Sequence, residues 1–200
     1  MKQREFLKAF SLVTLSTAMI GTATCCYIRA GLGGDSVAVF LEGVSCYWGI
    51  TLGTASWLFN VVLLIAAFFT ARKKLGWTTV YNSLLCGLFV DLANWALDPI
   101  LGLGDGLMFR WSLFLVGLLM LGAACALMML YCPGMSVLDA VTMAISERFR
   151  CAFRAVRIGI DLVLMAVGFA LGGTVGFGTA AAVAGTGPVI QLFYQLGKKE

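Results

Sequence analysis

Long stretches without a charged residue alternate with short clusters of Lys and Arg along this chain. Between Arg157 and Lys198 the one charged residue is Asp161. A helix needs about 20 apolar residues to cross the hydrocarbon core of a bilayer, and an open sheet edge finds no hydrogen-bond partners there. With 60% hydrophobic and 12% charged residues, the pattern predicts an all-α integral membrane protein rather than a soluble domain. Four further runs carry no charge at all: 9–28, 43–71, 75–90 and 111–138.

The spacing of these runs predicts six membrane-spanning helices. Of the 14 Lys and Arg residues, all except Arg29 and Arg110 fall on one side of the predicted spans. Because positively charged loops remain in the cytoplasm, this bias predicts a multi-pass membrane protein with both termini cytoplasmic. The expected spans are 8–28, 52–71, 77–97, 111–131, 155–172 and 177–196.

The chain also repeats itself at an offset of 100 residues, with weak identity but a shared order and spacing. Each copy would hold three spans, so the second copy must enter the membrane from the opposite side. The sequence therefore predicts a 3+3 inverted-topology repeat with units 1–100 and 101–200, an arrangement common among secondary transporters. The matching positions are 75–79 with 175–179, Gly87 with Gly187, Asp91 with Gln191, Ser36-Val37 with Ser136-Val137, and, with one residue of slip, 57–63 with 158–164.

Two apolar segments, 34–46 and 134–147, follow the first and fourth spans and are too short to cross a bilayer. Each begins with a chain-breaking residue and then a serine, Ser36 or Ser136, that can cap a helix. Two interpretations remain open. The segments are either interfacial helices lying on the membrane surface or re-entrant half-helices whose positive N-termini point at a central site.

Glycines gather in the last two spans. Gly168, Gly172 and Gly176 recur every four residues, a spacing that predicts close approach of two helices. The sequence from Gly185 to Pro188 interrupts the sixth span. It indicates either a plain kink or a break that exposes backbone carbonyl groups to a substrate.

Polar residues at membrane depth are the candidate site. Burying a charge there costs roughly 2.5–3.5 kcal/mol on insertion scales, so such residues usually face a bundle interior or a wet cavity. Asp91, Asn94 and Asp98 follow helical spacing and share one face with Gly87. Structural alternatives exist, because Arg157 lies one turn before Asp161, and Asp91 could bond to Asn94 or Gln191. The predicted substrate-binding residues are Asn60, Asp91, Asp161, Gln191 and Asn94.

Several kinds of chemistry have no basis in this sequence. The chain has no histidine, the usual general base and the commonest metal ligand. Its seven cysteines form no C-x-x-C pair and are typical of small residues in helix packing. The basic residues are scattered over separate loops and tails rather than forming a nucleic-acid footprint. We therefore expect no enzyme activity, no catalytic or metal-binding residue, no cofactor and no nucleic-acid partner.

Four stretches resemble one family in their order along the chain. They are AGLGGDSVAVFLEGVS, LGTASWLFNVVLLI, LGWTTVYNSLLCGLFVDL and GTAAAVAGTGPVI, and their motifs are similar to those of the YczE-like (YczE/YyaS/YitT) bacterial membrane proteins. Asp35-Ser36-Val37 stands where that family often has Pro-Trp-Asp. The resemblance covers most of the chain. It implies the fold and an inner-membrane location, and it implies no substrate.

These observations predict a small transporter or permease with a polar site near the midplane between the two repeats. Asp91 or Asp161 would titrate and couple transport to protons. The expected partners are the lipid bilayer, an unidentified small molecule or ion, and either a second copy or a partner membrane subunit. Two alternatives remain open: a membrane-embedded substrate-binding or accessory subunit like those of energy-coupling transporters, and a scaffold for a peripheral enzyme.

Overall fold

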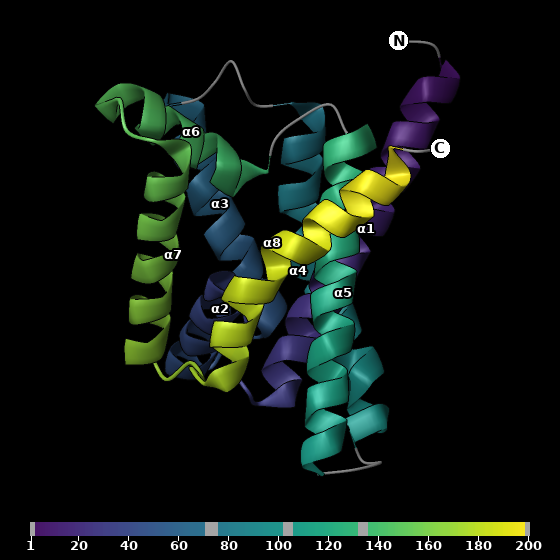
Figure 1. Ribbon diagram of the computed structural model, residues 1–200, viewed down its shortest axis with the longest axis vertical. Coiled ribbons are helices and arrows are strands. Elements are labelled where there is room, and N and C mark those ends of the chain that lie inside the picture. The colour runs from purple at the N-terminus through teal and green to yellow at the C-terminus, as the bar shows by residue number, and fades with distance from the viewer. Residues whose placement is uncertain (1–2, 71–75, 102–105, 132–135, 199–200) are drawn as a thin grey trace.

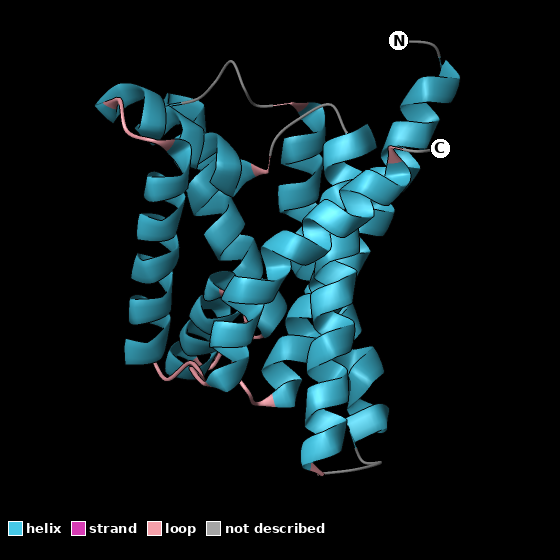
Figure 2. Cartoon of the chain, viewed as in Figure 1, coloured by secondary structure: helices cyan, strands magenta, loops and turns pink. Residues whose placement is uncertain are grey.

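The computed structural model describes residues 3–70, 76–101, 106–131 and 136–198, and within these ranges every regular element is an α-helix (Figure 2). The all-α prediction is therefore confirmed for the described residues. Each half of the chain contributes three longer helices and one short helix. The helices are α1 (Gln3–Ala30), α2 (Ser36–Trp48), α3 (Leu52–Thr70), α4 (Trp77–Leu101), α5 (Leu107–Tyr131), α6 (Val137–Phe149), α7 (Phe153–Ala170) and α8 (Phe177–Gly197).

Four of the described helices are long and apolar enough to cross a membrane: α1, α3, α4 and α5. The fifth and sixth predicted spans do form helices, α7 and α8. However, α7 carries Arg154, Arg157 and Asp161 within 18 residues, and the full six-span arrangement stays a prediction.

The short helices begin and end at residues suited to their conformation. Asp35 precedes α2, and its side chain accepts a hydrogen bond from the Ala38 amide at 3.2 Å. The expectation that Ser36 caps this helix was wrong, because Ser36 is already its first residue. Ser136 does occupy the cap position of α6, although its side chain makes no capping bond. After the two helices, Gly49 (φ 62°) and Arg150 (φ 53°) adopt the left-handed conformation that ends many helices.

The helices form two bundles, each with helices from both halves of the chain (Figure 1). In the first bundle α1 packs against α4 and α5, and α8 packs against α5. In the second bundle α2 packs against α7 and α6 against α3, with α2–α3 and α6–α7 contacts completing it. The contact between α3 and α4 is the main connection between the bundles.

Close backbone approach at glycines holds the second bundle together. A Cβ atom on Gly168 of α7 would lie 2.6 Å from the carbonyl oxygen of Val39 on α2. The predicted role of Gly168 in close helix packing is therefore confirmed. Gly172 (φ +99°) lies beyond the end of α7, in the turn to α8. The α8 helix continues through Gly185 to Pro188, so this segment does not break it.

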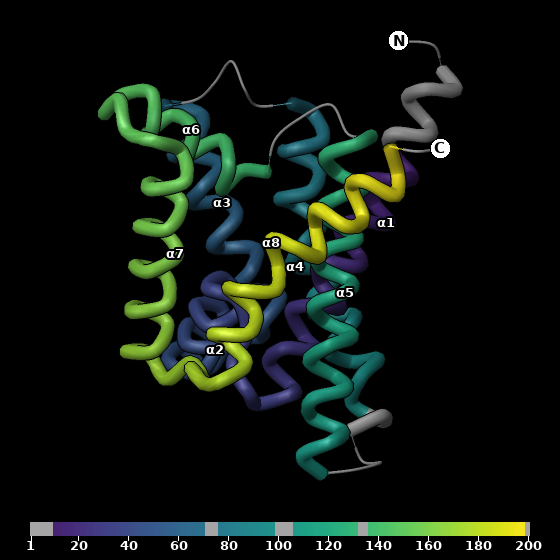
Figure 3. The backbone as a smooth tube through the Cα atoms, viewed as in Figure 1, coloured from purple at the N-terminus to yellow at the C-terminus, as the bar shows by residue number. Residues whose placement is uncertain are grey.

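The backbone trace places the two short helices at opposite ends of the molecule (Figure 3). The beginning of α1 and the end of α8 lie at the same end, where α6 also lies (Figure 1). The turn between α7 and α8 lies at the other end, beside α2. This arrangement is compatible with the predicted placement of both termini on one side of the membrane, and their cytoplasmic location stays a prediction.

Candidate functional site

A charged network joins α2, α6 and α7, and we call its four residues the α7 network: Ser36, Asp139, Arg157 and Asp161. The guanidinium of Arg157 donates to Oδ1 of Asp139 at 2.6 Å and to Oδ2 of Asp161 at 3.1 Å. The hydroxyl of Ser36 donates to Oδ1 of Asp161 at 2.6 Å. The ion pair between Arg157 and Asp161 that the sequence offered as an alternative is therefore present.

The α7 network has more negative than positive charge around it. Asp35 lies close enough to interact electrostatically with both Asp161 and Arg157, so three carboxyl groups face one guanidinium. Desolvation raises the pKa of Asp35 and of Asp139 above the usual range for aspartate. The Asp161 charge raises both pKa values further, whereas Arg157 and, for Asp35, the Ala38 amide oppose the shift. Each of these groups takes up a proton more readily than an ordinary aspartate, and protonation of Asp139 would loosen its ion pair with Arg157.

Two helix N-termini meet at this network. Ser36 is the first residue of α2, and Asp139 lies in the first turn of α6. Their partners Arg157 and Asp161 are one turn apart on α7, about 6 Å along the helix axis. The partial positive charge at each N-terminus therefore adds to the charge of Arg157 and stabilises the carboxylates.

A second polar region is an open groove of about 730 Å³, which we call the α4 groove. Its wall includes the predicted face of α4, because Asp91, Asn94 and Asp98 all line it. The Oδ1 atom of Asn94 accepts from Nε and Nη2 of Arg29 at 3.0 and 2.7 Å, and Arg29 also pairs with Asp98. The other lining residues are Ile28, Glu42, Ser45, Cys46, Ile50, Thr51, Leu52 and Trp95.

Asp91 has a clear structural task in this groove. Its Oδ1 accepts from the Gly53 amide at 2.7 Å, and its Oδ2 accepts from the Thr51 hydroxyl at 2.9 Å. Both donors lie at the start of α3, where helix amides lack partners within the helix. Asp91 therefore caps α3 from a neighbouring helix, rather than bonding to Asn94 or Gln191 as the structural alternative expected.

The five predicted site residues do not meet at one place. Asp161 belongs to the α7 network, whereas Asp91 and Asn94 belong to the α4 groove. Asn60 donates from Nδ2 to the carbonyl oxygen of Ser56, within its own helix, at 2.9 Å. Gln191 is exposed on α8. Spacing along single helices was predictable, but the assignment of each face to a neighbouring helix was not.

The sequence did not predict a functional role for several polar partners in these sites, among them Ser36, Asp139, Arg157 and Glu42. Glu42 on α2 accepts from the amide and the hydroxyl of Thr174 at 2.7 and 2.9 Å, which ties α2 to the turn between α7 and α8. Ser36 and Glu42 lie 125 and 132 positions from their partners, so no local pattern could pair them, whereas Arg157 is a local neighbour of Asp161. Among the described residues, no group of three His, Cys, Asp or Glu side chains is arranged to hold a metal ion.

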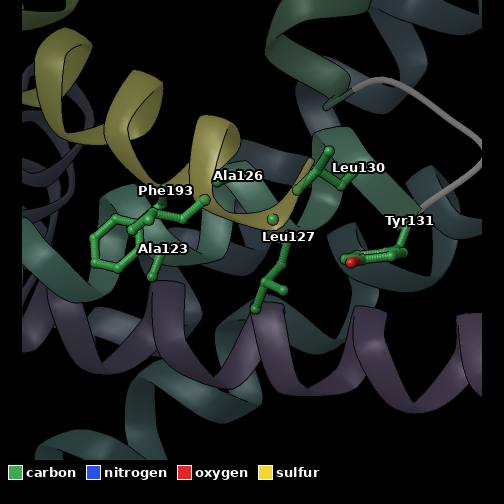
Figure 4. A pocket seen from close by; sticks show the side chains of 8 residues that line it. Ala123, Ala126, Leu127, Leu130, Tyr131 and Phe193 are labelled. Carbon is green, nitrogen blue, oxygen red and sulfur yellow. The ribbon is translucent and has the colours of Figure 1, made fainter. Parts of the chain in front are cut away.

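An apolar hollow of about 300 Å³ lies between α5 and α8 (Figure 4). Phe193 of α8 and the α5 side chains Leu127 and Tyr131 line it together with further leucine, alanine and glycine residues. The hollow offers aromatic and aliphatic surface and little hydrogen-bonding capacity. A polar solute therefore fits the α4 groove better than this hollow.

Comparison with known proteins gives relatives without an assigned activity. An uncharacterized protein of Haemophilus influenzae is 25% identical over 189 residues, which cover 94% of this chain and 84% of that protein. Two Bacillus subtilis proteins are also similar. The uncharacterized membrane protein YczE is 26% identical over 148 residues, 73% of this chain and 66% of its own length. The uncharacterized protein YyaS is 24% identical over 166 residues, 83% of this chain and 82% of its own length. No solved structure matches the chain.

The match at the level of the family extends over nearly the whole chain. Residues 7–195 fit the model of a family described as being of unknown function, DUF6198. The resemblance to YczE-like proteins is confirmed, and the four apolar helices agree with the description of YczE as a membrane protein. The chain is thus a YczE-like membrane protein and a member of the DUF6198 family.

Proposed function

We propose that this protein is a small transporter, not an enzyme, whose six membrane crossings form two inverted repeats of three. The observation that carries the proposal is the α7 network. It joins Ser36 of the first half to three charged residues of the second half. An ionised cluster at a contact between two halves is typical of a substrate or coupling-ion site.

The helix boundaries support the inverted repeat. The short helices α2 and α6 both contain 13 residues and start 101 positions apart. The left-handed residues that follow them, Gly49 and Arg150, are also 101 positions apart. The helices α4 and α8 start 100 positions apart. The offset of 101 agrees with the slip between 57–63 and 158–164, although the sequence repeat matched Ser36-Val37 with Ser136-Val137 at an offset of 100.

Helix packing supports the same proposal. The short helix of each half packs on the third helix of the other half: α2 contacts α7, and α6 contacts α3. The α1–α4 contact likewise has a counterpart in the α5–α8 contact. This reciprocity favours the re-entrant interpretation of α2 and α6, since both helices begin at the α7 network instead of lying apart from it.

Proton coupling fits the α7 network better than it fits Asp91. Asp91 already holds the start of α3 through two hydrogen bonds. In the network, protonation of Asp139 or Asp161 would loosen one ion pair of Arg157 while the other remains. Of the two coupling candidates predicted from the sequence, Asp91 and Asp161, the contacts support Asp161, and Asp139 and Arg157 join it in the proposed coupling site.

Proteoliposomes that contain a pH-sensitive dye test the transport proposal. Pools of small solutes are added outside, and we expect at least one pool to cause protein-dependent proton movement. The variant Asp161→Asn should abolish that movement, whereas Glu147→Gln, at the far end of α6, should retain it. Equal activity in both variants would contradict the proposed coupling site.

Purification in mild detergent tests the alternative of an accessory subunit. A transporter of this kind should purify as a monomer or homodimer. Stoichiometric recovery of an ATPase with the protein would contradict an autonomous transporter and favour a substrate-binding subunit of a larger complex.

A further inference from the structure

The two halves differ at one helix pair. In the first half, the consecutive helices α3 and α4 are closely packed. In the second half, the corresponding consecutive helices α7 and α8 diverge from their shared turn and are not among the packed pairs (Figure 1). Most contacts within each bundle have a counterpart in the other half of the chain. The α3–α4 contact, which has none, connects the two bundles.

Repeat-related glycines show the same asymmetry at atomic scale. A Cβ atom on Gly87 of α4 would collide with the carbonyl oxygen of Gly53 and lie 3.0 Å from Cβ of Trp57, both on α3. Its counterpart Gly187 on α8 would meet nothing within 4 Å. Gly159 on α7 also faces open space. The second half therefore keeps small residues where no helix touches them.

The paired polar residues follow the glycines. Asp91 of α4 binds the start of α3, whereas its counterpart Gln191 of α8 is exposed. The other contacts between the bundles, α1–α2 and α4–α6, likewise lack packed counterparts in α5–α6 and α8–α2. The helix-to-helix contacts between the bundles thus lie on the side of α3 and α4. On the other side the bundles are joined by Ala38 of α2, which shares a buried cluster with Ala182 of α8, and by the Gly178 amide, which donates to the Leu32 carbonyl oxygen at 2.8 Å.

We infer that the structure is one of two conformations, in which the α3–α4 contact is closed and the α7–α8 contact is open. In the other conformation the bundles rock against each other, so that α7 packs on α8 while α3 separates from α4. This inference rests on the inverted repeat of the proposed function, because the repeat defines which contacts correspond. Rocking of one bundle against another around a fixed site is the usual way in which such repeats alternate access.

A polar contact that joins the start of α3 to α4, and that must break in this motion, is accessible to water. Thr51, one of the two donors to Asp91, lines the open α4 groove, so water can replace it when α3 moves away. The contacts that must form need a close approach at Gly187, where space is already present. The α7 network lies on one of the two moving helices, so its protonation can influence which side closes.

Cysteine cross-linking distinguishes the two conformations. Ser56 Oγ lies 3.5 Å from the native Cys86 Sγ across the closed contact, so Ser56→Cys should form a disulfide there on mild oxidation. The pair Ile158→Cys and Gly187→Cys reproduces the Trp57–Gly87 approach in the second half. We expect its disulfide only in the other conformation. The two single variants Ile158→Cys and Gly187→Cys control for reactions with native cysteines.

All three substitutions are then combined in the full chain, and intact mass after thiol alkylation counts the disulfides in each molecule. Peptide mapping identifies which cysteines are joined. Chains with both disulfides should be far rarer than the product of the two separate yields. Independent formation of both disulfides, or no 158–187 disulfide above the single-variant controls, would overturn the inference.

A second pair guards against a variant that does not fold. Arg154 and Gln191 correspond to Gly53 and Asp91 and are both exposed, so Arg154→Cys with Gln191→Cys should give the same exclusion. The assay needs no solute. A protein that shows two exclusive disulfides but moves no solute contradicts the transport proposal alone, whereas solute movement without exclusive disulfides contradicts only the two-conformation inference.

Discussion

At the scale of single residues, Arg157 carries most of the polar contacts around α7. It binds one carboxylate on its own helix and one on α6. The side chains of these ion pairs are 30–38% exposed, so water screens them and the full energy of a buried ion pair does not apply. The loss of Arg157 would nevertheless leave two carboxylates without their cation beside a third.

A double-mutant cycle measures this dependence. We expect Arg157→Gln to lower the free energy of unfolding by about 1–2 kcal/mol, a value reduced from that of buried pairs because of the exposure. Asp139→Asn in the same chain should restore part of the loss, because it removes one unpaired charge. Denaturation in mixed micelles gives both values. Strictly additive effects of the two substitutions would show that their side chains do not interact.

Asp35 allows a prediction about pH. Desolvation raises its pKa in the folded protein, so the folded state holds this proton to higher pH than the unfolded state. Its contribution is therefore neutral below the unfolded pKa, about 3.9, and becomes increasingly destabilising as pH rises through the folded pKa. Asparagine caps helices as well as aspartate. Asp35→Asn should raise the melting temperature at neutral pH, with a gain that shrinks toward pH ~4. A gain of the same size at every pH would contradict the shift.

At the scale of helices, the sequence predicted where each helix begins and ends better than it predicted which helices pack together. The uncharged runs and the glycines between them placed α3, α4, α5, α7 and α8 within a few residues of their observed bounds, because helix ends coincide with charges and glycines. The pairing of α2 with α7 was not predictable. It depends on backbone contact between Gly43 and Gly168, which are 125 positions apart and carry no side chain to mark the contact. Only part of the α7 network was predictable for the same reason. Asp161 and Arg157 are neighbours along the chain, whereas Ser36 is not.

The glycines of α4 and α8 give a matched pair of substitutions. In Gly87→Ala the new methyl group would collide with α3, and overpacking of this kind typically costs about 1–3 kcal/mol. In Gly187→Ala the methyl group would enter open space, and alanine favours a helix by up to about 1 kcal/mol over glycine. We therefore expect Gly87→Ala to lower the melting temperature and Gly187→Ala to leave it unchanged or raise it. Equal destabilisation by both would show that α8 is packed where the structure leaves it free.

At the scale of the whole molecule, the number of crossings decides between a six-span transporter and a four-span membrane protein. Four described helices meet the requirements for crossing, and both counts leave the C-terminus on the cytoplasmic side if the N-terminus is there. Fusions at the termini therefore cannot separate them. The turn between α7 and α8 can, because it is outside the cell with six crossings and inside with four.

Labelling of one cysteine in intact cells settles this point. Val175 lies in the turn and is 40% exposed, so Val175→Cys provides a reactive site in a chain where the exposed native Cys46 is replaced by serine. With six crossings, a membrane-impermeant maleimide should label Val175→Cys in intact cells, and the exposed native Cys151 should react only after the cells are opened. Protection of Val175→Cys in intact cells, with labelling after lysis, would place α7 and α8 on the cytoplasmic side. That result would contradict the inverted-topology repeat. The α7 network could then no longer be interpreted as a site between two halves that cross the membrane in opposite directions.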